Sequence, residues 1–256
     1  MIYNNIQGTE RRLLKKAFRI IKRNYGCPGN DNVSISEVKI NYKEYEDTIY
    51  QKLKKDSFVF DSNPKSVIIQ DYLGKKREIF VYNVDERWVQ EFLKLQIEPT
   101  LDTTLEEYVY AFRRGKNDKD SYKYILKNNP KFILRIDIKD YFNSIDKERL
   151  FTDLKNLNLG DTLFKNIKKS LEHCTKGLPA GHVLSCMLSN FNLKDFDSKF
   201  SKNYTRYSDD IMFGVETMDE ARKILRTAKK LLEEYGFSLN PAKTRIITNP
   251  TLGKIS

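Results

Sequence analysis

The sequence contains few of the residues that build disulfide or zinc frameworks. Its 256 residues include three cysteines and two histidines. Cys27, Cys174 and Cys186 are too few and too scattered for a disulfide framework or a four-ligand zinc site, and they indicate thiols in a reducing compartment. His173 adjoins Cys174, and His182 stands alone. Because neighbouring residues rarely chelate one metal ion, we expect structural roles for these histidines and predict no zinc site.

The sequence also lacks a long apolar run. No stretch reaches the roughly 18 apolar residues that mark a transmembrane helix. The N-terminal Met-Ile-Tyr-Asn-Asn begins no apolar segment of signal length. Together with the scattered thiols, these absences predict a cytoplasmic protein without a membrane partner.

Positive charge, in contrast, is abundant. The chain has 46 Lys and Arg against 35 Asp and Glu, which gives a formal net charge of +11 and a pI near 9.3. This excess suits a densely negative partner such as nucleic acid, although a solvated basic surface gives the same count. Apolar residues make up 39% and aromatics 12% of the chain, enough for a core in one large or two small domains.

The first half of the chain predicts helices and one hairpin. Apolar residues recur with helical spacing over 9–24, 42–54 and 84–98, and the first of these helices has a basic face. Strand-like residues at 66–72 and 77–82 flank a short turn that contains Gly74. This pattern predicts a hairpin with a basic tip.

Two groups of cations in this half are candidates for binding anions. Lys75, Lys76 and Arg77 fit either a binding tip or an edge strand that charge keeps soluble. Over residues 107–116, aromatics alternate with cations, which suits stacking on bases beside phosphate contacts. Half-buried aromatics next to solvated cations would look the same. The cations of this second group are Arg113, Arg114 and Lys116.

From residue 131 the expected elements follow a recognisable order. A strand at 132–138 precedes helices at about 146–157 and 162–173, and 177–181 open a further helix that runs to about 200. A hairpin at 204–215, a helix from Thr217 to Gly236 and a strand near 244–248 complete the series. The order predicts a split β-α-β-β-α-β antiparallel sheet with helices on one face. Its first strand and its hairpin are then central neighbours.

The hairpin turn carries Tyr207-Ser208-Asp209-Asp210. Two adjacent aspartates alone are common in turns. Alternation along the first strand, however, puts Asp137 on the face opposite the apolar residues, and the topology brings it beside Asp209 and Asp210. Three carboxylates without His or Cys prefer hard cations, above all Mg²⁺. Two such ions support nucleotidyl transfer, because they activate a 3′-hydroxyl and neutralise a leaving pyrophosphate.

An ordered set of motifs resembles those of reverse transcriptases, in particular the bacterial group II intron, retron, diversity-generating and phage-defence lineages. The palm motifs are Arg135-Ile-Asp-Ile-Lys-Asp-Tyr-Phe-Asn-Ser-Ile-Asp146, Gly177-Leu-Pro-Ala-Gly181, Arg206-Tyr-Ser-Asp-Asp-Ile211 and Leu239-Asn-Pro-Ala-Lys-Thr244. Residues 26–31, 75–77 and 110–115 resemble the fingers motifs. The resemblance implies an α+β fold of the right-hand polymerase type, with fingers over 1–130 (plus part of the helices at 146–176) and a palm over 131–256.

The resemblance also implies roles for single residues. Asp137, Asp209 and Asp210 match the catalytic carboxylates, which bind metal with the carbonyl of Ile138. Phe142 matches the steric gate that crowds a ribose 2′-hydroxyl, and Lys243 matches a palm lysine that assists pyrophosphate departure. The remaining residues expected to bind the nucleotide are Lys75, Lys76, Arg77, Ala180, Gly181 and Tyr207, and those expected to bind nucleic acid are Arg113, Arg114 and Lys116.

Two features depart from the family pattern. Ala180 stands where a Gln is common, and its methyl group cannot make amide contacts to nucleotide and template, which puts fidelity, sugar choice and template use in doubt. The sequence ends at Leu252-Gly-Lys-Ile-Ser256, which resembles the start of the primer grip. The expectation is therefore fingers and palm without a thumb. A longer chain or another protein would supply the thumb, or the enzyme holds its primer differently.

The predicted function is RNA-directed DNA synthesis with two Mg²⁺ ions, or Mn²⁺ in their place, in a retroelement or in phage defence. The expected partners are an RNA template, a DNA or RNA primer, deoxynucleoside triphosphates and a structured noncoding RNA. One alternative is untemplated or protein-primed DNA synthesis. The other is an RNA-binding scaffold without catalysis, which three clustered carboxylates disfavour because their repulsion costs stability unless cations offset it.

Overall fold

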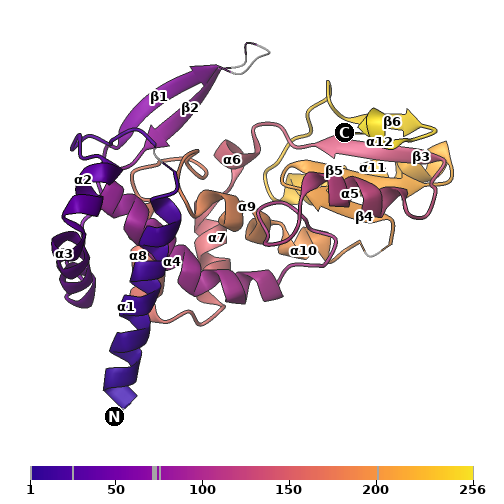
Figure 1. Cartoon of the computed structure of the whole chain (residues 1–256). Coiled ribbons are helices and arrows are strands. Elements are labelled where there is room, and N and C mark those ends of the chain that lie inside the picture. The colour runs from indigo at the N-terminus through magenta and orange to yellow at the C-terminus, as the bar shows by residue number, and fades with distance from the viewer. Residues whose placement is uncertain (1, 25, 71–73, 75, 201, 256) are drawn as a thin grey trace. The chain divides into compact units, whose positions relative to one another are not determined.

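The computed structural model describes residues 2–24, 26–70, 74, 76–200 and 202–255. The chain folds into two compact units, one formed by Met1–Pro99 and Phe151–Ser185, the other by Thr100–Leu150 and Cys186–Ser256 (Figure 1). The bounds of the two units follow from which parts of the chain pack together. The division into fingers (1–130) and palm (131–256) stays a prediction.

The first unit is mainly helical and carries one hairpin. Its elements are α1 (Ile2–Ile21), α2 (Ile35–Ile40), α3 (Tyr42–Lys54), β1 (Lys65–Gln70), β2 (Lys76–Val81), most of α4 (Val84–Thr103), part of α7 (Lys147–Lys155) and α8 (Asp161–Ser170). The buried Trp88 joins three of the helices. Its ring lies 4.5 Å from Phe18 and 5.5 Å from Tyr42, and its indole N–H donates to the Leu14 carbonyl at 2.7 Å. Aromatic packing of this kind contributes beyond its buried area and fixes α1 and α3 against α4.

The second unit is built on a four-stranded antiparallel sheet (Figure 1). Its elements are α5 (Asp118–Leu126), β3 (Phe132–Asp137), α6 (Tyr141–Ser144), α9 (Ser185–Asn192, of which Ser185 belongs to the first unit), α10 (Lys194–Asp197), β4 (Tyr204–Tyr207), β5 (Asp210–Val215), α11 (Met218–Glu234), β6 (Arg245–Thr248), α12 (Leu252–Ile255) and the remaining parts of α4 and α7. The strand order is β4-β5-β3-β6. The predicted split topology is confirmed, with β3 next to the β4–β5 hairpin.

Helices α5 and α11 pack on the strands of the sheet. Ile133 of β3 and Met212 of β5 are buried against Tyr122 and Ile125 of α5. Helix α11 begins at a capping box, in which the Thr217 hydroxyl accepts the N–H of Glu220 at 3.1 Å. The helix contacts β3 and β5. On the predicted apolar face of β3, Leu134, Ile136 and Ile138 are buried, while Ile133 lies with Arg135 and Asp137 on the other face, part of which α5 covers.

The segment after Gly177 differs from the prediction. The helix expected to open there begins only at Ser185 and ends at Asn192, before the short α10. Gly177 and Gly181 have φ values of +60° and +97°, which a right-handed helix cannot contain. The Ala180 carbonyl instead accepts the N–H of Phe80 in β2 at 2.9 Å. This backbone bond makes the segment a connection that pairs with the hairpin.

Helix α4 also exceeds its prediction, since it continues through Pro99 to Thr103. A proline inside a helix removes one hydrogen bond and costs about 3 kcal/mol. Ile97 and Leu101 on either side of it are fully buried, so their packing offsets that cost. In the described part of the chain, no helix is both long enough and apolar enough to cross a bilayer.

Candidate active site

The register of the sheet brings together two of the predicted carboxylates. Asp137, the last residue of β3, lies directly opposite Asp210, the first residue of β5. The Ile138 N–H donates to the Asp209 carbonyl at 3.2 Å, which continues the pairing past the strand ends. Directly opposite residues of antiparallel strands have side chains about 5 Å apart. Asp137, Asp209 and Asp210 therefore occupy one end of the central strand pair.

Asp137 is held by the segment that precedes β6. Its carboxylate accepts from the Asn240 amide at 3.0 Å and from the Lys243 ammonium at 2.9 Å. Its backbone carbonyl accepts the N–H of Asn240 at 2.8 Å. Lys243 thus lies beside Asp137, and its expected role in pyrophosphate departure stays a prediction. The Lys243–Asp137 pair has side-chain exposures of 58% and 12%, so solvent screens it on the lysine side only.

Asp210 has a cationic partner that the sequence analysis did not predict. Arg135 donates from Nε and Nη2 to the two carboxylate oxygens, at 2.8 and 2.7 Å. Such a bidentate pair is stronger and more directional than a single bond. Arg135 lies two residues before Asp137 on the same face of β3, so it reaches diagonally across to β5. The alternation of β3 placed Arg135 on this face, but only the register shows its partner.

Burial and mutual repulsion act on the other carboxylates of the turn. Burial raises the pKa of Asp209 above its ordinary value, and the Asp137 charge raises it further, while Lys243 opposes the shift. Burial also raises the pKa of Asp210, against the effect of Arg135. A site in which charged carboxylates are disfavoured gains stability from an added cation.

The donor set matches a hard divalent ion in its chemistry. Carboxylate and carbonyl oxygens are the ligands that Mg²⁺ prefers. Among the residues that the structure describes, no three His, Cys, Asp or Glu side chains are grouped so as to hold a metal ion. Lys243 and Arg135 instead neutralise two of the carboxylates. The donor chemistry suits a divalent ion, whose charge would take over the neutralising role of these two cations, and metal binding at these residues stays a prediction.

A buried ion pair stabilises the turn between β4 and β5, which carries Ser208 and Asp209. Arg206 and Asp197 are fully buried and joined by two hydrogen bonds, at 2.8 Å from Nε and 2.5 Å from Nη2. Arg206 also donates to the carbonyl of Ser208 at 3.1 Å, and Ser208 has a φ of +59°. A non-glycine residue in the left-handed region is strained, so the turn needs such support. The sequence motif contains Arg206 but does not indicate this role, because its partner Asp197 lies in another element, α10.

Further donors complete this network around Arg206. The Tyr204 hydroxyl donates to Asp197 at 2.5 Å. Arg206 Nη1 donates to the Asn190 side chain at 3.0 Å, and Asn190 in turn donates to the Ala111 carbonyl. Every charged atom of the pair thus has a partner, which is the condition under which a buried ion pair is tolerated.

Phe142 and Tyr207 belong to the same unit as the carboxylates. Phe142 lies in α6, which follows β3, and its half-exposed ring packs on the edge of the buried Tyr141 at 5.8 Å. The Tyr141 hydroxyl donates to the Ser189 carbonyl at 2.5 Å and so anchors α6. Tyr207, the last residue of β4, is half-exposed and its ring lies 6.4 Å from that of Phe112. Gate and nucleotide-binding roles for Phe142 and Tyr207 stay predictions.

The cations at the hairpin and at 107–116 differ in their surroundings. Lys75 lies outside the described residues, while Lys76 and Arg77 are exposed on β2. Arg113 donates to Asp102 at 2.6 Å and to the Val109 carbonyl at 3.0 Å. Lys116 lies 4.8 Å above the Tyr110 ring and donates to the Glu107 carbonyl. Arg113 and Lys116 therefore stabilise their own loop, and Arg114 is the exposed cation of this group.

Gly181 makes a close approach that only glycine permits. Its φ is +97°, and a Cβ there would overlap the carbonyl oxygen of Phe80 and crowd the side chain of Ile79. Ala180 beside it is exposed. Both residues belong to the first unit, and their roles toward a nucleotide stay predictions.

We expect Gly181→Ala to destabilise the first unit by about 2–4 kcal/mol, because left-handed strain adds to an overlap with backbone that cannot move away. Equilibrium unfolding in urea measures the loss. Gly160→Ala is the matched control, since Gly160 has a φ of +85° and nothing within 4 Å of its added Cβ. Equal losses for the two variants would contradict the close approach.

His182, next to Gly181, is a buried neutral histidine. Burial, together with a smaller effect of the neighbouring His173, lowers its pKa from an ordinary 6.5 to about 3. The unfolded chain therefore binds a proton between pH 6.5 and 3 that the folded chain does not. We expect stability to fall by about 1.4 kcal/mol for each pH unit below 6.5.

Urea unfolding at pH 7.5 and 5.5 tests this dependence. His182→Asn keeps an acceptor for the Leu184 N–H, which His182 Nδ1 accepts at 3.2 Å, but cannot take up the proton. We expect the variant to lose less stability than the original chain between the two pH values. The same loss in both proteins would show that another group carries the pH dependence.

Comparisons with known proteins agree with this geometry. Residues 53–253 match the family described as reverse transcriptase (RNA-dependent DNA polymerase). The chain is 26% identical over 203 residues to the retron Ec73 reverse transcriptase of Escherichia coli, covering 72% of this chain and 64% of the relative. It is 24% identical over 163 residues to an uncharacterized 91 kDa protein in a cob intron of Schizosaccharomyces pombe, covering 59% of this chain and 20% of that protein.

Solved structures share the fold at low sequence identity. Apo telomerase from Candida tropicalis, truncated from its C-terminal domain, aligns with a TM-score of 0.55 and 14% identity, over 73% of this chain and 50% of that one. Telomerase from Candida albicans, in complex with a fragment of telomeric RNA, aligns with a TM-score of 0.53 over 85% and 47% of the two chains. The chain thus spans about two thirds or less of the proteins it matches.

Proposed function

Because the chain belongs to the reverse transcriptase family, we propose that it is an RNA-directed DNA polymerase that extends a 3′-hydroxyl with deoxynucleoside triphosphates. The observation that carries the proposal is the register of β3 and β5, which puts Asp137 opposite Asp210 with Asp209 in the adjoining turn. Three carboxylates at one strand end have no evident structural purpose, since their repulsion costs stability. A polymerase site gives them one.

We propose the following roles for the residues of this site. Asp137, Asp209 and the carbonyl of Ile138 would hold divalent ions, Mg²⁺ or Mn²⁺, which when bound lower the pKa of the attacking hydroxyl and neutralise the leaving pyrophosphate. Arg135 fixes the orientation of Asp210. Lys243 is the cation of this unit that can follow the departing pyrophosphate, because its ammonium already lies 2.9 Å from Asp137 on an exposed stem.

Primer extension tests the activity. The chain is given an annealed RNA template and DNA primer, Mg²⁺ and the four deoxynucleoside triphosphates, and the products are sequenced. We expect products complementary to the template, and none with EDTA or with Asp137→Ala. Synthesis that survives Asp137→Ala would overturn the site, and metal-independent RNA binding without any incorporation would favour a noncatalytic scaffold.

A second candidate, untemplated or protein-primed DNA synthesis, is favoured by Ala180. Its methyl group is exposed where the family commonly has Gln, so this position offers no amide to the nucleotide or template. The same assay without template distinguishes the two, because an untemplated enzyme incorporates nucleotides regardless of template sequence. A protein-primed product would stay attached to the chain after denaturation and shift its mass.

The biological setting that we propose is a mobile retroelement or phage defence, with a structured noncoding RNA as template. The support is the likeness to a retron reverse transcriptase over 72% of this chain. Sequencing the nucleic acid that copurifies with the expressed protein tests this setting. A single structured RNA with attached DNA is the expected result, and a random sample of host RNA would speak against it.

A further inference from the structure

Lys15 and Arg19 of α1, and Lys22 directly after its last residue, lie on one side of the helix. Lys15, Arg19 and Lys22 are spaced by four and three residues, so they follow one another on successive turns. All three are exposed, whereas Phe18 between them is buried. The basic face predicted from the sequence is therefore confirmed. Whether it forms a binding site depends on its position relative to α2 and α3.

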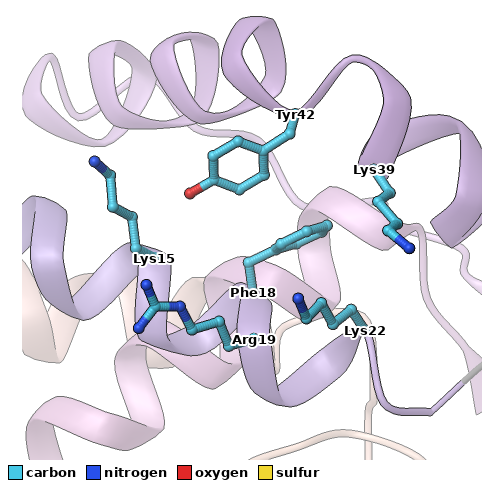
Figure 2. A pocket seen from close by; sticks show the side chains of 6 residues that line it. All are labelled: Lys15, Phe18, Arg19, Lys22, Lys39 and Tyr42. Atoms are coloured by element: carbon cyan, nitrogen blue, oxygen red, sulfur yellow. The ribbon is translucent and has the colours of Figure 1, made fainter.

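This face forms a pocket with α2 and α3. The pocket has a volume of about 310 Å³ and is lined by Lys15, Phe18, Arg19, Lys22, Lys39 and Tyr42. Figure 2 shows Tyr42 extending from α3 toward the cations of α1, with Lys39 of α2 at the other side. No acidic side chain is among the lining residues. A concave site with four cations concentrates positive potential more than a flat, solvated helix face does.

Charges near the pocket are unbalanced. The buried Glu46 lies 3.5 Å from Arg11 and 3.9 Å from Lys15, so it offsets these two. Within the described part of the chain, Arg19, Lys22 and Lys39 take part in no salt bridge. Their mutual repulsion is relieved by an anion that enters the pocket.

Aromatic rings give this pocket a rigid wall. Tyr42 stacks on Trp88 with an interplanar angle of 22° and packs against Phe18 at 5.0 Å. Burial and the nearby Glu46 raise the pKa of Tyr42 to about 12, so its phenol stays neutral beside the cations. The cations therefore project from helices that the aromatic cluster holds in place.

We propose that this pocket binds a backbone phosphate of a single-stranded nucleic acid, at a site separate from the carboxylates of the sheet. Its volume is at the lower end for ligand pockets, about 300–1,000 Å³, and suits one nucleotide rather than a duplex. Lys and Arg side chains beside an aromatic ring are the usual composition of sites that follow a single strand. The choice of nucleic acid over another polyanion rests on the proposed polymerase function.

The single tryptophan of the chain makes the pocket directly observable. Trp88 is the only tryptophan, and its ring contacts both aromatic residues of the lining. Titration with a 12-nucleotide RNA, a DNA of the same sequence, and inorganic phosphate is followed by Trp88 fluorescence and by anisotropy of a labelled oligonucleotide. The salt dependence of the dissociation constant is measured for each oligonucleotide.

A pair of double variants isolates the pocket from general charge. Arg19→Gln with Lys22→Gln removes two lining cations, while Arg12→Gln with Lys16→Gln removes two exposed cations of the same helix that do not line the pocket. Both variants lower the net charge by two, and neither pair is buried, so both are expected to fold. Circular dichroism melts check this.

For the pocket variant we expect the slope of log K against log [salt] to fall by about 0.7, the value for one lost phosphate contact, with at least about tenfold weaker binding at low salt. The outer variant should change the slope by less than half as much. A larger effect on RNA than on DNA identifies the template strand as the source of the phosphate, and the reverse identifies the product. Equal losses in the two double variants, or an unchanged Trp88 signal with all three ligands, would overturn the proposal.

The outcome is separable from that of the polymerase proposal. The titrations are repeated with Asp209→Asn, in which the pocket is intact. Loss of synthesis together with unchanged salt slopes keeps both proposals. Another outcome is that the chain makes no DNA under any condition while the pocket variant still shows a smaller slope of log K against log [salt]. That result would support the phosphate site and contradict the polymerase function.

Discussion

Replacing Asp209 by Asn is expected to lower the rate of nucleotide incorporation at least about a thousandfold while leaving primer-template binding within a factor of two or so. The amide keeps the shape of the side chain but cannot supply the negative charge that a divalent ion requires. Single-turnover incorporation of one nucleotide measures the chemical step, and filter binding measures the affinity. A loss of less than tenfold would remove Asp209 from the catalytic set.

Asp219→Asn is the matched control for this change. Asp219 is in the same unit, on α11, with a 91% exposed side chain that pairs with Arg222 at 3.0 Å. The same loss of one charge there should leave the rate unchanged. A comparable loss in both variants would point to net charge instead of to the site.

The stability of Asp209→Asn should move in the opposite direction from its activity. Burial and Asp137 raise the pKa of Asp209, so its charged form is disfavoured in the folded chain. The folded chain favours the protonated form of Asp209, so its free energy of unfolding falls when Asp209 ionises as the pH rises. The neutral Asn side chain avoids this loss. We expect a higher Tm for the variant at pH 7 without divalent ions. Addition of Mg²⁺ should raise the Tm of the original chain more than that of the variant.

Breaking the buried pair under the turn is expected to cost about 3–5 kcal/mol of unfolding free energy. In Asp197→Ala the Arg206 guanidinium stays fully buried without its carboxylate, and the Tyr204 hydroxyl loses its acceptor. Urea unfolding monitored by circular dichroism measures the loss. Because Arg206 also holds the Ser208 carbonyl, the fraction that folds should incorporate nucleotides poorly even at low temperature.

Two comparisons make this prediction specific. Breaking the exposed Arg222–Asp219 pair with Arg222→Ala should cost no more than about 0.5 kcal/mol, because solvent already screens it. Replacing both buried partners, with Arg206→Met and Asp197→Leu, should recover much of the stability but not the activity. If the single and double variants were equally unstable, an unpaired buried charge would not be the cause.

The palm-like sheet could be predicted because its strands have strong local patterns. The strand predicted at 132–138, the hairpin at 204–215 and the capping box at Thr217 are each confirmed, and their order admits few topologies. The segment after Gly177 was predicted wrongly as helix. Its conformation depends on a backbone bond to Phe80, about a hundred residues away in sequence, which no local pattern encodes.

The site shows the same division. The neighbourhood of Asp137 and Asp210 followed from topology and is confirmed by the register. Arg135 and Arg206 were both visible as charges, yet their partners lie across a strand pair and in α10. Whether two side chains in different elements pair depends on the distance between them, which the order of residue types does not predict. The binding roles of Phe142, Lys76 and Arg77 remain predictions for the same reason.

If the carboxylates bind divalent ions as proposed, the ion pairs of Lys243 and Arg135 affect how the metal would bind. A metal ion can bind Asp137 or Asp210 only if it displaces Lys243 or Arg135 from that carboxylate, so the side-chain cation and the metal ion compete for it. The apparent metal affinity is then the intrinsic affinity reduced by the fraction of chains in which the tethered cation has let go. Because Lys243 is on an exposed stem and Arg135 is held by two hydrogen bonds, Asp137 should exchange its cationic partner for a metal ion more readily than Asp210.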